Sequence, residues 1–155
     1  MNPSAPSKAE IEILANFRYR LRCFLRTSEQ LTRDAGVTNL QYLLLLHVEG
    51  FPGRNWASIT ELAERLQAKH HGVVALVNRS EKLGLVSRRP GRVDGREVEV
   101  HLTRSGARTV RHLAQLHRDE LIRMAGVFAV PSQRQLRATR SPTSRQRRVT
   151  HAAVQ

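Results

Sequence analysis

The side chains that could carry out chemistry are few, and their spacing favours binding over catalysis. His70 and His71 are neighbours, so on a helix they point about 100° apart and cannot jointly hold one metal ion. His112 and His117 are also poorly spaced for a shared ion. The sequence has no glycine-rich phosphate loop, nucleophile elbow or metal-ligand motif. We therefore expect neither an enzyme nor a metalloprotein, and no cofactor.

The only cysteine is Cys23, so no disulfide can form within the chain and no cysteine-based zinc site can be built. The nearby arginines, Arg22 and Arg26, favour a reactive thiol and therefore a redox sensor. A lone cysteine is also commonly a small buried apolar side chain. The sequence leaves both interpretations open.

The strongest global signal is a surplus of positive charge. The 155 residues contain 26 Lys and Arg against 13 Asp and Glu, a net charge of +13. Six arginines and no acidic residue follow Ser132, so more than half of the surplus lies before that position. Such a surplus favours a polyanionic partner, either nucleic acid or an acidic membrane surface.

Length and composition indicate one small, mainly helical domain. Apolar residues make up 40% of the chain but aromatic residues only 5%, so the core must consist mostly of Leu, Val and Ala, which suits helices. Residues 1–10 contain no apolar leader segment and are expected to be disordered. The longest apolar run, 42–46, is far too short to span a bilayer. We expect a cytoplasmic protein without a membrane partner.

Long helices are expected on both sides of the middle of the chain. Apolar residues recur every three or four positions over about 8–34, the spacing of one helix face. A second helix over 39–49 has four consecutive leucines, which predict burial on most sides. The last helix, 104–129, must stop there because Pro131 disfavours helical backbone at the preceding residue. Residues 131–155 keep no apolar period and are expected to form a basic, disordered tail.

The middle of the chain reads as helix, break, helix, strand, turn and strand. The capping box Ser58–Glu61 starts the first of these helices. The second runs from about 69 to 82 and is closed by Gly84. Residues 85–88 and 97–102 predict two antiparallel strands around a basic turn. This order predicts a helix-turn-helix followed by a wing, a small β-hairpin.

The second helix and the hairpin carry the residues that can contact a nucleic-acid duplex. A helix in the major groove needs an apolar face that anchors it and a polar face that reaches the bases. Arginines of the hairpin can contact phosphates or the minor groove. For His70 and His71, a solvated surface position is the other interpretation. The candidate contacts are Lys69, His70, His71, Ala75, Arg79, Arg88, Arg92 and Arg96.

The linked order of these motifs resembles the MarR family of winged helix-turn-helix regulators. The matching segments are Ser58–Leu66, Leu76–Arg79, Leu83–Val86, Asp94–Arg96 and Val98–Gly106. The resemblance implies a mainly α fold with a small β-hairpin wing. Within a MarR-like domain at 11–130, it places the winged helix-turn-helix at 58–102 and dimerisation helices at about 11–34 and 104–129.

The resemblance also implies a function. Members of this family are sequence-specific double-stranded DNA-binding transcription regulators, usually homodimeric repressors that a small ligand releases. By analogy, Asp94 orients the wing and Arg96 lies near its minor-groove tip. Two positions depart from the family pattern: Lys69 replaces the usual hydroxyl cap of the recognition helix, and Ser80 stands where the family has an apolar residue.

Two further interpretations remain as alternatives. Tyr19, Tyr42, His47 and Trp56 could line a ligand pocket between the dimer helices and the DNA-binding lobe, or belong to ordinary packing. The alternative function is a sequence-indifferent basic nucleic-acid-binding protein. Such a protein would share the charge, but it would not need a recognition helix and a wing together.

Overall fold

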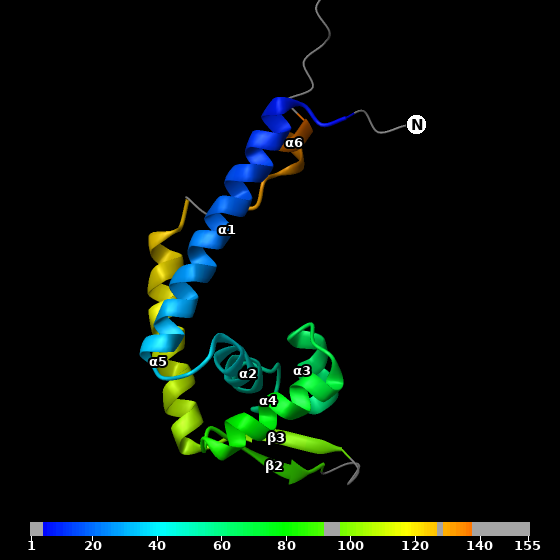
Figure 1. Cartoon of the computed structure of the whole chain (residues 1–155), viewed down its shortest axis with the longest axis vertical. Coiled ribbons are helices and arrows are strands. Elements are labelled where there is room, and N and C mark those ends of the chain that lie inside the picture. Colours follow the sequence, from blue (N-terminus) through cyan, green and yellow to red (C-terminus); the bar gives the residue numbers. More distant parts are fainter. Residues whose placement is uncertain (1–4, 92–96, 127–128, 138–155) are drawn as a thin grey trace, which may run out of the picture.

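The structure, a computed structural model, describes residues 5–91, 97–126 and 129–137. Six helices and three strands form in this part of the chain (Figure 1). In chain order they are α1 (Lys8–Asp34), α2 (Asn39–Glu49), β1 (Trp56–Ser58), α3 (Ile59–Arg65), α4 (His70–Lys82), β2 (Val86–Pro90), β3 (Val98–Leu102), α5 (Arg104–Arg123) and α6 (Gln133–Arg137). The predicted fold class, mainly α with a small β wing, is confirmed.

The three strands form one antiparallel sheet in the order β1-β3-β2. The central strand is β3, so that Trp56 of β1 and Ser87 of β2 both lie opposite His101. The predicted hairpin is present as β2 and β3, whereas β1 was not predicted. With only three residues, the last of which is the α3 N-cap Ser58, β1 is too short to show an alternating apolar pattern.

Hydrogen-bonded caps explain where most helices begin. Complete capping boxes start three of them: Ser7 with Glu10 at α1, Thr38 with Gln41 at α2, and Ser58 with Glu61 at α3. In each box, a side-chain oxygen satisfies a backbone N–H that has no partner within the helix. The N-cap of α4 is Lys69, whose side chain makes no such bond. After α4, Gly84 takes a left-handed conformation, with φ of 68°, which suits a helix exit.

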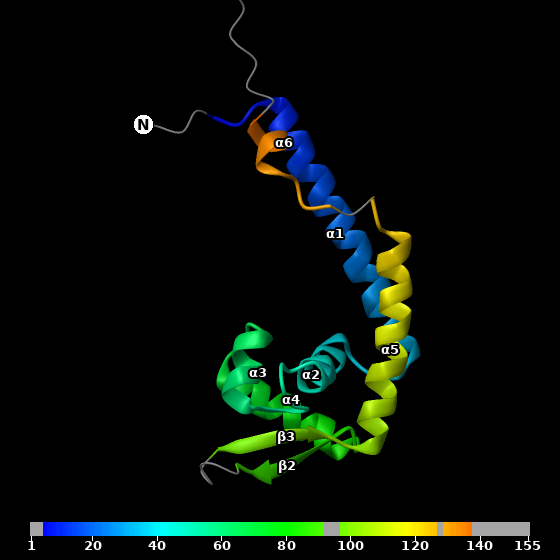
Figure 2. The ribbon, with the colours of Figure 1, turned by 180° about the vertical axis from the view of Figure 1, so that it is seen from behind.

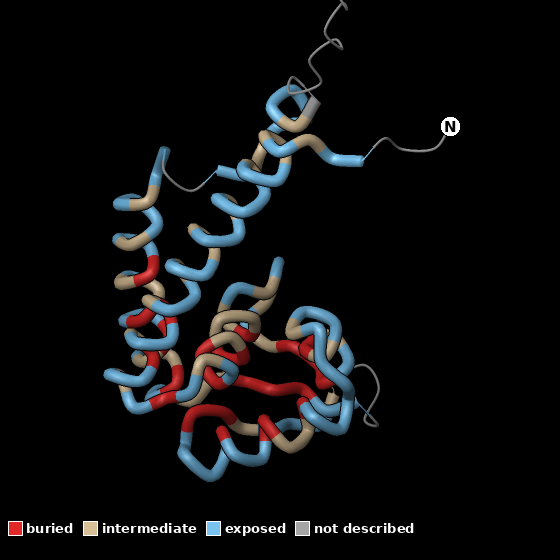
Figure 3. The backbone as a smooth tube through the Cα atoms, turned by 45° about the horizontal axis from the view of Figure 1, so that its top comes forward, coloured by how far each residue is buried: buried red, intermediate tan, exposed pale blue. Residues whose placement is uncertain are grey.

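The core lies in a lobe built from α2, α3, α4, the sheet and the N-terminal half of α5 (Figure 3). Leu44 and Leu45 of α2 have no exposed surface, as the run of leucines predicts, and Leu62 of α3 and Leu113 of α5 are equally buried. The recognition helix candidate α4 joins this core through Val73 and other side chains of one face.

The N-terminal part of α1 and the C-terminal part of α5 project from the lobe as an arm (Figures 1 and 2). Of the 27 residues of α1, only Ser28 and Thr32 are buried, both near its C-terminal end. Large apolar side chains remain exposed on both helices: Ile11, Leu14, Tyr19, Leu25, Leu121 and Ile122. The arm therefore presents an uncovered apolar surface. None of the helices described is both long and apolar enough to cross a membrane.

The first turn of α5 is held closely against the lobe. The hydroxyl of Thr103 donates to the carbonyl oxygen of Gly84 at 2.5 Å and accepts from the backbone N–H of Gly106 at 3.1 Å. A Cβ atom on Gly106 would lie only 1.9 Å from the carbonyl oxygen of Leu85. Only glycine permits this approach, so the start of α5 is fixed to the junction between α4 and β2.

Regular structure ends differently from the prediction. Helix α5 stops at Arg123 rather than near Ala129, and Gly126 follows with φ of 81°. The short helix α6 forms within the segment expected to be disordered, because Ser132 and Gln135 bond to each other's backbone N–H groups. It lies beside the N-terminal part of α1 (Figures 1 and 2). Residues 138–155 of the predicted tail lie outside the described residues.

Candidate nucleic-acid interface

Helix α4 has one buried face and one exposed face, as a recognition helix requires. Val73, Leu76 and Val77 anchor it in the core. The candidate contact residues lie on the other side: Lys69, His70, His71 and Arg79 are exposed and Ala75 is half-buried. The structure thus brings all five candidate residues of this helix to the accessible surface.

A polar contact joins α4 to the wing strand β2. The guanidinium of Arg88 donates to the side-chain oxygen of Asn78 and lies 3.7 Å from a carboxylate oxygen of Glu81. The backbone N–H of Arg88 also donates to Glu81, at 3.2 Å. Arg88 was predicted as a DNA contact, but it is engaged within the protein. Of the other wing residues, Arg89 is exposed on β2, while Arg92, Asp94 and Arg96 lie outside the described residues.

A groove of about 260 Å³ separates α4 from the sheet. Its lining comes from the start of α3, the start of α4 and the two wing strands: Ser58, Ile59, Thr60, His70, Val74, Arg88, Glu97 and Val98. His70 therefore lies where the start of α4 meets the start of α3 and the wing.

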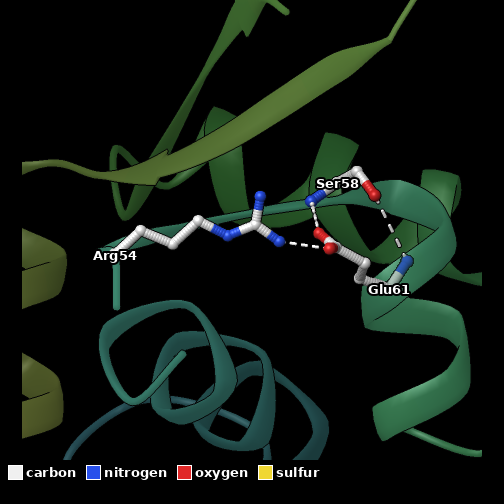
Figure 4. A network of polar contacts seen from close by, with 3 residues as sticks. All are labelled: Arg54, Ser58 and Glu61. Atoms are coloured by element: carbon white, nitrogen blue, oxygen red, sulfur yellow. Dashed lines mark hydrogen bonds and ion pairs between the residues drawn. The ribbon is translucent and has the colours of Figure 1, made fainter. Parts of the chain in front are cut away.

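Arg54, in the loop between α2 and β1, contacts two aromatic rings and a carboxylate beside the helix-turn-helix. Its guanidinium lies over the rings of Phe51 and Trp56, with distances of 4.2 Å and 3.8 Å from its central carbon to the ring centroids. It also donates to Glu61 of the α3 capping box (Figure 4). A role for Arg54 was not predicted from the sequence, because a loop residue belongs to no helical or strand pattern that would single it out.

The carboxylate of Glu61 serves two partners. It accepts from the backbone N–H of Ser58 at 2.8 Å through one oxygen and from Arg54 through the other (Figure 4). Burial alone would raise the pKa of Glu61, but the hydrogen bond from Ser58 and the charge of Arg54 outweigh it and lower the pKa below the ordinary value. The capping box of α3 is thus held in its charged form.

A buried acid–base pair lies on the central strand β3. Glu99 and His101 are almost completely buried, and the Nε2 atom of His101 lies 2.8 Å from a carboxylate oxygen of Glu99. The ring of His101 stacks on Trp56, with 6.2 Å between ring centroids. The burial of these two residues was not predicted. They alternate with apolar residues along the strand, a pattern that places polar side chains on the exposed face.

The four candidate ligand residues lie in different environments. Tyr42 is buried and stacks on His117 at 4.5 Å, and burial raises its pKa. His47 lines a hollow beside Phe51, and its pKa is lowered by burial and by the charge of Arg65. The ring of Trp56 is covered by the guanidinium of Arg54. Tyr19 is 62% exposed on α1.

Cys23 is exposed on α1. It shares a shallow surface hollow with Tyr19, Arg22 and Arg26. The interpretation of Cys23 as a buried apolar side chain is therefore wrong for this single chain. Its surroundings include the arginines from which redox sensing was inferred.

Comparison with known proteins finds one family in both the family model and the solved structures. Residues 35–97 match the model of the MarR family. No curated protein matches the chain. The matched residues span α2, the helix-turn-helix and the wing strand β2, and they end just before β3.

Solved structures share the fold over most of the chain. AbsC, a MarR family transcriptional regulator from Streptomyces coelicolor, is 22% identical with a TM-score of 0.64, covering 76% of this chain and 81% of its own. A variant of MepR from S. aureus, solved bound to an oligodeoxyribonucleotide, is 22% identical with a TM-score of 0.56, covering 74% and 81%. NadR, solved with 4-hydroxyphenylacetate, is 18% identical with a TM-score of 0.66, covering 82% and 86%.

Proposed function

We propose that this chain, whose residues 35–97 match the model of the MarR family, is a sequence-specific DNA-binding transcription regulator. The observation that carries the proposal is the arrangement of α4. Lys69, His70 and His71 are exposed at its N-terminal end, its opposite face is anchored in the core, and a basic wing strand lies beside it. A helix of this construction can enter a major groove while its neighbours contact the phosphates.

In this proposal, different side chains contribute affinity and specificity. His70 and His71 meet base edges, because the first turn of a recognition helix reaches deepest into the groove. Lys69 and Arg79 contact phosphates. Arg96, by analogy with the family, reaches the minor groove at the wing. Arg88 stays a proposed DNA contact and, through its bonds to Asn78 and Glu81, also holds the wing strand against α4.

The functional unit in this proposal is a homodimer. Exposed Ile11 and Leu14 on α1 and exposed Leu121 and Ile122 on α5 form the apolar surface that a second copy would cover. A twofold dimer presents two recognition helices to two half-sites of an inverted repeat. A small effector that changes the relation of arm and lobe would then control binding, most simply as release of a repressor.

Selection from a random duplex pool tests this function. We expect enrichment of an inverted repeat whose half-sites lie about one helical turn, ~10 base pairs, apart. The selected duplex should bind about 1,000-fold or more tightly than a scrambled duplex at the same salt concentration. Equal affinity for both would reject sequence-specific regulation and favour the sequence-indifferent nucleic-acid binder.

A further inference from the structure

The guanidinium of Arg54 contacts three parts of the molecule. It lies 4.2 Å from the ring centroid of Phe51, in the loop that follows α2, and 3.8 Å from that of Trp56, on β1. Its ion pair with Glu61 reaches α3, the first helix of the helix-turn-helix (Figure 4). One partly buried side chain therefore joins the loop after α2, the first strand of the sheet and the helix-turn-helix.

The contact with Glu61 acts on the start of α3. Glu61 accepts from the backbone N–H of Ser58 at 2.8 Å, and its own N–H donates to the Ser58 hydroxyl at 3.3 Å. The carboxylate must point back toward Ser58 to close this box. Arg54 holds it in that direction by binding the other carboxylate oxygen (Figure 4).

The contact with Trp56 continues to the wing. Trp56 lies opposite His101 in the sheet and stacks on its ring. His101 is bound to the buried carboxylate of Glu99 on β3, the strand that forms one side of the wing. A continuous series of side-chain contacts therefore runs from Phe51 through Arg54 and Trp56 to the wing strand.

We propose that Arg54 is a positioning residue for DNA binding, which sets the helix-turn-helix against the wing through Glu61 and Trp56 and does not contact the duplex. This inference rests on the proposed function. Winged helix-turn-helix recognition requires α4 and the wing to engage neighbouring grooves together, so their relative position determines the affinity. Because the charge of Arg54 is neutralised by Glu61 and covered by two rings, we expect Arg54 to affect DNA binding by holding these elements in position.

A matched control lies on the same aromatic ring. The guanidinium of Arg65 lies 4.4 Å from the centroid of Phe51, so Arg65→Gln removes the same charge and a similar stacking contact but leaves the Glu61 ion pair. We expect Arg54→Gln to weaken binding to the selected duplex about 2- to 30-fold, the range that corresponds to losing a helix cap. Arg54→Lys, which keeps the charge but cannot lie flat over both rings, should fall between Arg54→Gln and the parent protein.

The salt dependence separates positioning from phosphate contact. If Arg54 neutralised a phosphate, Arg54→Gln would reduce the log–log salt slope by about 0.9. We expect an unchanged slope with a weaker affinity. A reduced slope, or equal losses of affinity in Arg54→Gln and Arg65→Gln, would overturn the proposal. In a double-variant cycle, Arg54→Gln should cost little more once Glu61→Gln is present, and simple additivity would likewise contradict the coupling.

A pH profile of thermal stability tests the same pair without DNA. The charged and titratable groups around Glu61 are Arg54, Arg65, Glu64 and His47. Because the pKa of Glu61 is lowered in the folded protein, the ion pair contributes stability above the ordinary value of 4.5, and this contribution is lost as pH falls through the folded pKa.

The difference in Tm between the parent and Arg54→Gln should therefore be largest near neutral pH. It should shrink as the pH falls below 4.5. The difference for Arg65→Gln should not close in the same way. A parent that binds selected and scrambled duplex equally would reject the proposed function, whereas a pH-independent difference for Arg54→Gln would reject the positioning role alone.

Discussion

Ser80 is a buried serine whose hydroxyl has no hydrogen-bond partner. It has no exposed surface and lies on the core-facing side of α4, where the family pattern has an apolar residue. Burying a hydroxyl without a partner costs about 1–3 kcal/mol. We therefore expect Ser80→Ala to raise the free energy of unfolding by about 1 kcal/mol, measured by chemical denaturation.

A second buried serine provides the control. The hydroxyl of Ser28 lies 2.8 Å from the Nε2 atom of buried His117 and 3.3 Å from the side-chain oxygen of Asn39. Ser28→Ala removes these partners and should lower stability, while Ser80→Ala raises it. Loss of stability in both variants would show that the Ser80 hydroxyl is satisfied in solution.

At the scale of elements, α4 is the one long helix of the lobe that begins without a side-chain cap. Its N-cap, Lys69, has extended backbone angles suited to a capping side chain, but makes no such bond. Lys69→Ser should therefore stabilise the protein by about 0.5–2 kcal/mol. The same change should weaken DNA binding and reduce the salt slope by about 0.9, because we propose that Lys69 contacts a phosphate.

Denaturation and binding titrations on the same variant separate the two effects of Lys69→Ser. Ser58→Ala, which removes an existing cap from α3, should lower both stability and affinity. An unchanged salt slope in Lys69→Ser would contradict the phosphate contact, and unchanged stability would show that the α4 backbone cannot use the new hydroxyl.

Local signals made most elements predictable. The capping box at Ser58 and Glu61, the exit at Gly84 and the apolar period of α1 each follow from residues close in sequence. The misses have physical reasons as well. Strand β1 exists because β3 lies beside it, and α6 depends on one reciprocal bond between Ser132 and Gln135 and on a position against α1.

The candidate interface was predictable only in part. The outward face of α4 follows from helical period, so its five candidate residues were found. The contact of Arg88 with Asn78, ten residues away, depends on how β2 turns back along α4. Arg54 lies close in sequence to Trp56 and Glu61, but its contacts with them depend on the conformation of the loop before β1. Such partners arise from tertiary structure, which no local pattern encodes.

At the scale of the whole molecule, the exposed arm predicts association. Ile122 is 65% exposed on α5, within the apolar surface that a second copy would cover. We expect the parent protein to be a dimer at micromolar concentration by sedimentation or light scattering, and Ile122→Asp to shift it toward monomer. Binding to the selected inverted repeat should fall with the dimer.

Leu83 offers a control of similar exposure outside the arm. It is 60% exposed at the end of α4, so Leu83→Asp introduces the same charge on the lobe and should leave the dimer intact. A monomeric parent protein, or equal dissociation in both variants, would contradict dimerisation through the arm.

The close contact at Gly106 makes α5 a lever. With the first turn of α5 fixed to the α4–β2 junction, the helix cannot tilt at the arm without carrying the lobe with it. Its 20 residues span about 30 Å at ~1.5 Å per residue, so a tilt of roughly 10° displaces one end by about 5 Å relative to the other. In a dimer, a tilt of both α5 helices would change the distance between the two recognition helices. That distance must match the fixed spacing of the two half-sites in an inverted repeat.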